Sequence, residues 1–179
     1  ATQLNVAALE GALSSLGTAL AASTPFEGAG KALQDGKLDK AAKELEKLDK
    51  RIEALKAAKN VYWGIEVEVM RLTGAAWLAY AQGKGDEALA LMRQSADTED
   101  RNEKHIVTPA RLLPARELLG DLLMELKLSA EALKEYEASQ KREPNRLRGY
   151  YGAGLAASQA GERAKAKLYF GRLVAMAGK

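Results

Sequence analysis

Apolar residues recur every three or four positions along most of the chain, which is the spacing of one face of an α-helix. The longest uninterrupted run predicts a helix over 38–58 and consists of Leu38, Ala41, Leu45, Leu48, Ile52 and Leu55. A second run predicts a helix over 61–82 and consists of Tyr62, Ile65, Val69, Leu72, Ala76 and Ala79. Because only a short segment separates the two runs, we expect an antiparallel hairpin.

Turn residues divide the rest of the chain into further helices. Gly36, Gly83 and Gly161 each follow a periodic run, as expected of glycine at a helix end. Pro144 ends another run, because proline disfavours helical geometry in the residue before it. The remaining helices are predicted at 4–22, 25–35, 85–97, 113–126, 129–142, 146–160 and 162–177, with one long irregular stretch at 98–112.

Composition supports an all-α fold and narrows the chemistry. Ala and Leu, both good helix formers, make up about a third of the chain, while the β-branched residues that favour strands are scarce. The chain has no cysteine, which excludes disulfides, thiolate zinc sites and cysteine nucleophiles. His105 is the only histidine, which excludes most catalytic triads, metal sites and proton shuttles that use histidine. We therefore expect a noncatalytic protein without a cofactor or metal.

The charge pattern favours neither nucleic acid nor a membrane as partner. The chain carries 27 Lys and Arg against 24 Asp and Glu, a net charge of +3. Charges of both signs alternate along the predicted helices, which indicates a solvated face rather than a basic nucleic-acid patch. No apolar run reaches the roughly 18 residues that a membrane span needs.

An internal repeat is present in the C-terminal third. At an offset of 34 residues, Gly120 aligns with Gly154, Ala132 with Ala166, and Tyr136 with Phe170. The small residues would let two helices cross closely, and the aromatic residue of the second helix would fill the gap against the next unit.

The segment 113–146 resembles a tetratricopeptide repeat, through Leu119-Gly120, Leu123, Ala132, Tyr136 and Pro144. The segment 147–179 matches the same family through Tyr150, Gly154, Ala166 and Phe170. The resemblance implies a right-handed superhelix, or solenoid, of antiparallel helix pairs.

The resemblance extends more weakly toward the N-terminus, and together its parts predict a single domain over 1–179. It implies a repeat with a long first helix at 61–102, a divergent repeat at 22–58, a capping helix at 1–22 and an insertion at 98–112. The C-terminal two thirds are similar to the C-terminal part of longer bacterial tetratricopeptide proteins of unassigned function. This similarity suggests a fragment of a longer chain, from a bacterial cytoplasm or periplasm.

The family binds protein segments in a concave groove lined by the first helix of each pair. That register implies a groove formed by Thr73, Trp77, Tyr80, Glu117, Asp121, Met124, Tyr151, Leu155 and Ser158. Trp77 and Tyr80 would be anchors for a peptide, although Trp77 could instead pack in the core under the N-terminal helices. Glu117 and Asp121 stand where some members carry a cationic clamp, so a neutral or basic peptide is expected.

A second hypothesis is structural, in which the repeats pack on another domain of the same protein or self-associate through the N-terminal helix. Other polar clusters have simpler interpretations. His105 is expected to face solvent or cap a helix. The acidic run Asp97, Glu99, Asp100 and Glu103 lacks the ligand spacing of a calcium loop. A basic cluster is interpreted as a solvated edge, or else a patch for an acidic partner, and consists of Lys141, Arg142, Arg146 and Arg148.

Overall fold

The computed structural model of this chain describes residues 23–103, 111 and 113–177, and these residues form helices without any strand. The fold is therefore all-α, as predicted. The chain divides into two compact units, unit 1 (residues 1–105) and unit 2 (residues 106–179). The predicted helix at 4–22 and His105 lie outside the described residues. The prediction of one continuous array over 1–179 stays a prediction.

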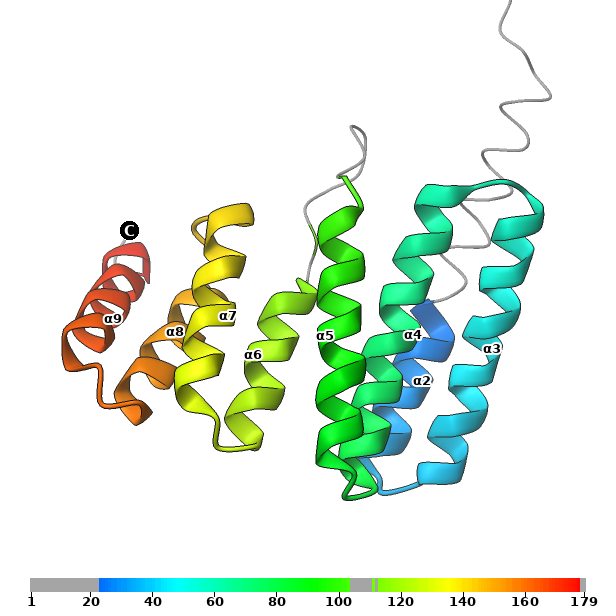
Figure 1. The fold of residues 1–179 in the computed structure, drawn as a ribbon, viewed down its shortest axis with the longest axis horizontal. Helices are drawn as coiled ribbons and strands as arrows, with labels where there is room; N and C mark the ends of the chain where they lie inside the picture. Colours follow the sequence, from blue (N-terminus) through cyan, green and yellow to red (C-terminus); the bar gives the residue numbers. More distant parts are fainter. Residues whose placement is uncertain (1–22, 104–110, 112, 178–179) are drawn as a thin grey trace, which may run out of the picture. The chain divides into compact units, whose positions relative to one another are not determined.

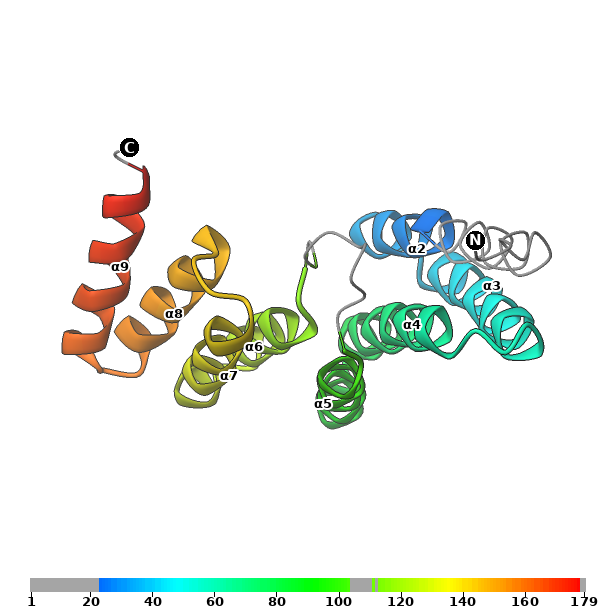
Figure 2. The ribbon, with the colours of Figure 1, turned by 90° about the horizontal axis from the view of Figure 1, so that it is seen from above.

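Unit 1 contains four described helices, α2 (Ser23–Gln34), α3 (Leu38–Ala57), α4 (Val61–Ala81) and α5 (Gly85–Arg101). Helix α4 packs against α2, α3 and α5, and Figure 2 shows it between α2 and α5. The predicted stripe of α3 is confirmed, because its residues from Ala41 to Leu55 are buried. Val67, which is outside the predicted stripe of α4, is also buried, since this helix has neighbours on several sides.

Unit 2 contains α6 (Ala115–Glu125), α7 (Ser129–Arg142), α8 (Leu147–Gln159) and α9 (Arg163–Ala177) (Figure 1). Within this unit each helix packs on the next in the chain, and α6 also contacts α8. The sequence therefore placed every described helix correctly in order, with small differences at the ends.

Five of the connections between consecutive helices share one turn geometry. A three-residue connection with a central left-handed residue joins α2 to α3, α3 to α4, α4 to α5, α6 to α7 and α8 to α9. The central residues are Gly36, Lys59, Gly83, Lys127 and Gly161, with φ between 54° and 80°. After each of them, the next backbone N–H bonds back to a carbonyl in the last turn of the helix, for example Lys84 N to Ala79 O at 2.9 Å. The predicted glycine ends and the predicted hairpin are thus confirmed.

The predicted start of the irregular stretch at 98–112 is too early, because α5 continues to Arg101. Thr98 and Glu99 are buried in this last turn, and so is Asn102 directly after it. The Asn102 Nδ2 atom donates to Glu66 Oε1 of α4 at 2.7 Å. Burial of polar side chains against α4 extends the helix, and hydrophobic periodicity does not detect this contact. Residues 104–110 and 112 lie outside the described part.

The aromatic-on-glycine packing expected from the repeat is present in both hairpins of unit 2. A Cβ atom on Gly120 of α6 would lie 2.8 Å from the Tyr136 ring, and one on Gly154 of α8 would lie 2.7 Å from the Phe170 ring. The Tyr136 ring also lies against Gly152 of the following helix, where a Cβ would approach to 2.4 Å. Tyr136 is therefore held between α6 and α8 and is only 2% exposed.

Helix α9 is joined to α7 by a shared carboxylate. Glu137 Oε1 accepts from Lys165 Nζ at 2.9 Å and from the Tyr169 hydroxyl at 2.7 Å. Burial opposes ionisation of Glu137, but the two hydrogen bonds together with the charges of Lys165 and Lys141 lower its pKa below the ordinary value. Burial and the Glu137 contact raise the pKa of Tyr169 to about 12, so this hydroxyl remains a donor at neutral and acidic pH.

We predict that Gly152→Ala destabilises the protein by about 1–3 kcal/mol, because the buried Tyr136 ring cannot move away from the added methyl group. The control is Gly171→Ala on α9, where a Cβ would meet nothing within 4 Å. That change should be neutral or stabilising by up to about 1 kcal/mol, because alanine favours helix over glycine. Urea unfolding of both variants measures the difference, and equal free energies of unfolding would contradict the packing described.

We also predict a stabilising contribution from Glu137 that depends on pH. Since its pKa is lowered in the folded state, the contribution is present above the ordinary value of 4.5 and is lost as the pH falls through the folded-state pKa. Thermal melting should therefore place Glu137→Gln below the wild type at neutral pH, with a smaller gap well below pH 4.5. A gap that stays constant with pH would show that the Glu137 charge contributes nothing.

Candidate functional site

A buried polar cluster of unit 2 lies where α6 meets α8. Glu117 of α6 is fully buried, and its Oε1 atom accepts from Arg146 Nε at 2.7 Å. The Glu117 Oε2 atom has no hydrogen-bond donor, but it lies 3.8 Å from Arg148 Nε. Arg146 also donates to the carbonyl of Arg111 at 2.9 Å. A buried carboxylate is thus held by arginines from the start of the next hairpin.

Asp121, one helical turn after Glu117, is part of the same cluster. It accepts from the Tyr136 hydroxyl at 2.6 Å and forms a close ion pair with Arg148. Burial raises the pKa of Asp121, while the hydrogen bonds from Tyr136 and Arg148 act in the opposite direction. Burial and the Asp121 contact also raise the pKa of Tyr136, which keeps its hydroxyl protonated as a donor. This group of residues, Glu117, Asp121, Tyr136, Arg146 and Arg148, is called the α6–α8 network below.

Small residues make the α6–α8 network possible. A Cβ on Gly149 of α8 would lie 2.9 Å from Glu117 Oε1 and 2.0 Å from Gln140 Nε2. Only a glycine lets the α8 backbone come this close to the buried carboxylate. The sequence reveals the acidic and basic residues but not this pairing, because Glu117 and Arg146 are distant along the chain.

Two sequence-based interpretations are corrected by the α6–α8 network. Arg146 is not part of a solvated edge, since it is half-buried and pairs with Glu117. Arg148, Lys141 and Arg142 are exposed as expected, but Arg148 is paired with Asp121. The two carboxylates were also expected to repel an acidic ligand. They are instead paired, Glu117 is buried, and the four formal charges cancel, so that argument for a neutral or basic peptide does not hold.

The remaining groove candidates of unit 2 lie beside the network. Met124 and Leu155 are half-buried, Ser158 is exposed, and Tyr151 is 54% exposed. The Asp121–Arg148 pair joins positions 27 residues apart on the adjacent helices α6 and α8. Met124 of α6 and Tyr151 of α8 each lie three residues further along these two helices, which contact each other. Leu155 follows Tyr151 one turn later on the same face of α8.

In unit 1 the three groove candidates of α4 differ in how accessible they are. Thr73 is buried, and its Oγ1 atom lies 2.8 Å from Ser95 Oγ of α5. Since the Ser95 hydroxyl donates to the Val69 carbonyl at 3.1 Å, Thr73 is the donor of this pair. Thr73 therefore joins two helices and is not exposed to a ligand.

Trp77 and Tyr80 are both half-buried and form an edge-to-face pair with ring centroids 5.8 Å apart. A different tryptophan, Trp63, packs against the buried cluster of unit 1 that includes Leu48 and Leu55. The Trp77–Tyr80 pair is thus partly accessible and can contribute to a binding surface.

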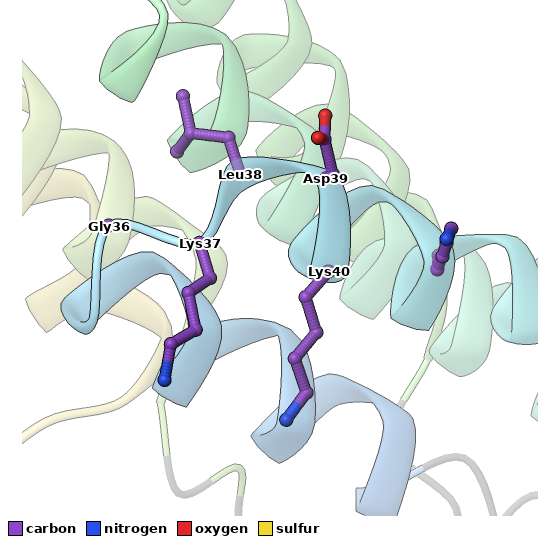
Figure 3. Close-up of a pocket in the computed structure, with 6 residues that line it drawn as sticks. Gly36, Lys37, Leu38, Asp39 and Lys40 are labelled. Atoms are coloured by element: carbon purple, nitrogen blue, oxygen red, sulfur yellow. The ribbon is translucent and has the colours of Figure 1, made fainter.

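Three further features of the described residues bear on function. No group of three or more His, Cys, Asp or Glu side chains within the described ranges could hold a metal ion. Of the described helices, none is long and apolar enough to cross a membrane. An open hollow of about 590 Å³ lies at the turn between α2 and α3, where Lys37 and Lys40 extend side by side (Figure 3). These lysines are exposed, and Lys37 pairs with Asp35 at 3.0 Å.

Comparison with known proteins adds no family assignment. No protein-family model matches the chain, and no curated protein matches it significantly.

We predict that Arg146→Met destabilises the protein by about 3–5 kcal/mol, because it leaves the buried Glu117 carboxylate without its hydrogen-bond donor. Arg148→Met should cost only about 1 kcal/mol, since that side chain is 43% exposed. Replacing Glu117 and Arg146 together by Met should restore much of the stability, because the buried charge is then removed. Chemical unfolding ranks the variants, and a larger loss for Arg148→Met would contradict the assignment.

Proposed function

We propose that this chain is a noncatalytic protein-binding module of tetratricopeptide-like helical hairpins. The packing of Tyr136 on Gly120 and of Phe170 on Gly154 supports a repeat of 34 residues in unit 2. The helices are joined by short turns and pack on their neighbours in the chain, as in helical-repeat proteins. Such proteins commonly present side chains of successive first helices to a bound segment.

The proposed binding surface is formed by Met124, Tyr151 and Leu155 on α6 and α8. Its main support is Tyr151, a large aromatic side chain that is more than half exposed although its neighbours Tyr150 and Gly152 are buried. Aromatic anchors provide much of the binding energy at protein interfaces. The α6–α8 network beneath it cancels its own charge and fixes the spacing of the two helices, so the surface is preorganised.

This surface favours a partner segment with aliphatic or aromatic side chains at its centre. Met124 and Leu155 offer apolar contact, and Ser158 and the exposed part of Arg148 offer hydrogen bonds at the edges. The Trp77–Tyr80 pair of α4 is a second, separate aromatic contact point in unit 1.

The test is selection of ligands from a displayed library of random peptides, followed by fluorescence anisotropy with the enriched peptides. We expect Tyr151→Ala/Leu155→Ala to weaken binding at least about tenfold, because each hot-spot residue contributes more than 1 kcal/mol. Trp77→Ala/Tyr80→Ala tests the contribution of unit 1 in the same assay.

The matched control is Val61→Ala/Leu128→Ala, which removes two exposed apolar side chains at other places. Its affinity should equal that of the wild type, and circular dichroism should show unchanged helix content in every variant. The proposal fails if no peptide is enriched, or if the control weakens binding as much as the Tyr151 and Leu155 changes.

A further inference from the structure

The outer face of α9 exposes large apolar side chains. One side of α9 packs on α8 through the buried Tyr169 and the half-buried Phe170. On the other side Leu168 is 48% exposed and Val174 is 70% exposed. Between them, a Cβ on Gly171 would meet nothing within 4 Å. This face, formed by Leu168, Gly171 and Val174, is called the α9 outer face below.

Helix α7 shows how an equivalent face is covered inside unit 2. At the offset of 34 residues, Phe170 corresponds to Tyr136 and Val174 to Gln140. Tyr136 is almost completely buried because α8 covers it through Gly152, and the Gln140 amide reaches the Arg146 carbonyl beside that helix. Phe170 and Val174 therefore stand at positions where α7 packs against the following helix, whereas Leu168 corresponds to the exposed Lys134.

The charged side chains of helix α9 itself are all positive. Helix α9 contains Arg163, Lys165, Lys167 and Arg172 and no Asp or Glu. Lys165 is paired with Glu137, but in the described part of the chain Arg163, Lys167 and Arg172 have no carboxylate partner. By helical spacing Arg163, Lys167 and Val174 lie along one edge of the face, and Leu168 and Arg172 along the other. Cations thus border the apolar centre on both sides.

An open hollow of about 620 Å³ adjoins the Arg172 edge. It is lined by Asn145, Tyr150, Arg172, Ala175 and Met176. The Arg172 guanidinium lies 5.6 Å from the centre of the Tyr150 ring, a cation–π contact that holds the charge at the wall of the hollow. A carboxylate side chain entering the hollow would find this guanidinium in place.

From this arrangement we propose that the α9 outer face binds an acidic amphipathic helix of a partner protein. The aliphatic side chains of that helix cover Leu168, Gly171 and Val174, and its carboxylates pair with Arg163, Lys167 and Arg172. An acidic partner is favoured because every charge on α9 is positive. This surface is separate from that of Met124, Tyr151 and Leu155, so the inference goes beyond the function proposed above.

The experiment uses the full chain and two synthetic helical peptides of equal length. Both have leucines at helical spacing, and their remaining positions are glutamate in one peptide and lysine in the other. Fluorescence anisotropy should show binding of the glutamate peptide only, and added salt should weaken it. Arg163→Glu/Lys167→Glu should weaken binding about tenfold or more, and Val174→Asp should also weaken it.

Two controls separate this site from general effects. Lys40→Glu/Lys43→Glu makes the same change in net charge at exposed positions of α3 and should leave binding unchanged. Tyr151→Ala/Leu155→Ala should also leave it unchanged, which distinguishes this site from the proposed groove. Circular dichroism of each variant verifies that the helices remain folded.

Three outcomes would overturn the proposal. The first is equal binding of both peptides, or binding of the glutamate peptide that Arg163→Glu/Lys167→Glu leaves unchanged. The second is failure to bind the glutamate peptide together with binding to vesicles that contain phosphatidylserine, which would assign the face to an anionic membrane surface. The third is concentration-dependent dimerisation that Val174→Asp abolishes without any peptide binding, which would assign the face to a second copy of the chain.

Discussion

Insertion of the Tyr136 ring between two glycines determines how α6, α7 and α8 pack. The ring fills the space that side chains on Gly120 and Gly152 would otherwise occupy. Its hydroxyl is fixed by Asp121, whose second oxygen pairs with Arg148 of α8. One side chain therefore sets both the spacing of three helices and the position of a charged group. The binding surface proposed on α6 and α8 depends on this packing, because it is formed by two of those helices.

The sequence was sufficient for the features that depend on local spacing. The apolar stripe of α3 is buried as its period of three and four residues indicates, and the turns at Gly36, Gly83 and Gly161 have the left-handed geometry for which glycine is favoured. The match of Gly120 with Gly154 corresponds to equivalent contacts with aromatic rings. Each of these features is determined by residues within one helix, one turn or one hairpin.

Features that depend on polar contacts between helices were not predictable in the same way. From the sequence, Glu117 was expected to line the groove. It is instead fully buried, because Arg146 of the next hairpin pairs with it. Helix α5 is one turn longer than its apolar pattern, because Asn102 bonds to Glu66 of α4. Lys59 and Lys127 occupy left-handed positions that their residue type does not favour. For Glu117 and for the end of α5, the partner on another helix rather than the local sequence decides the outcome.

The short three-residue turns have a consequence for how the chain folds. They join helices that pack directly on each other, so most contacts in each unit are between residues close together along the chain. Little loop-closure entropy is then lost before native contacts form, and chains with such local contacts fold on a timescale of about microseconds to milliseconds. The α6–α7 hairpin is nevertheless completed only by α8, because Gly152 covers the Tyr136 ring and Arg146 pairs with the buried Glu117.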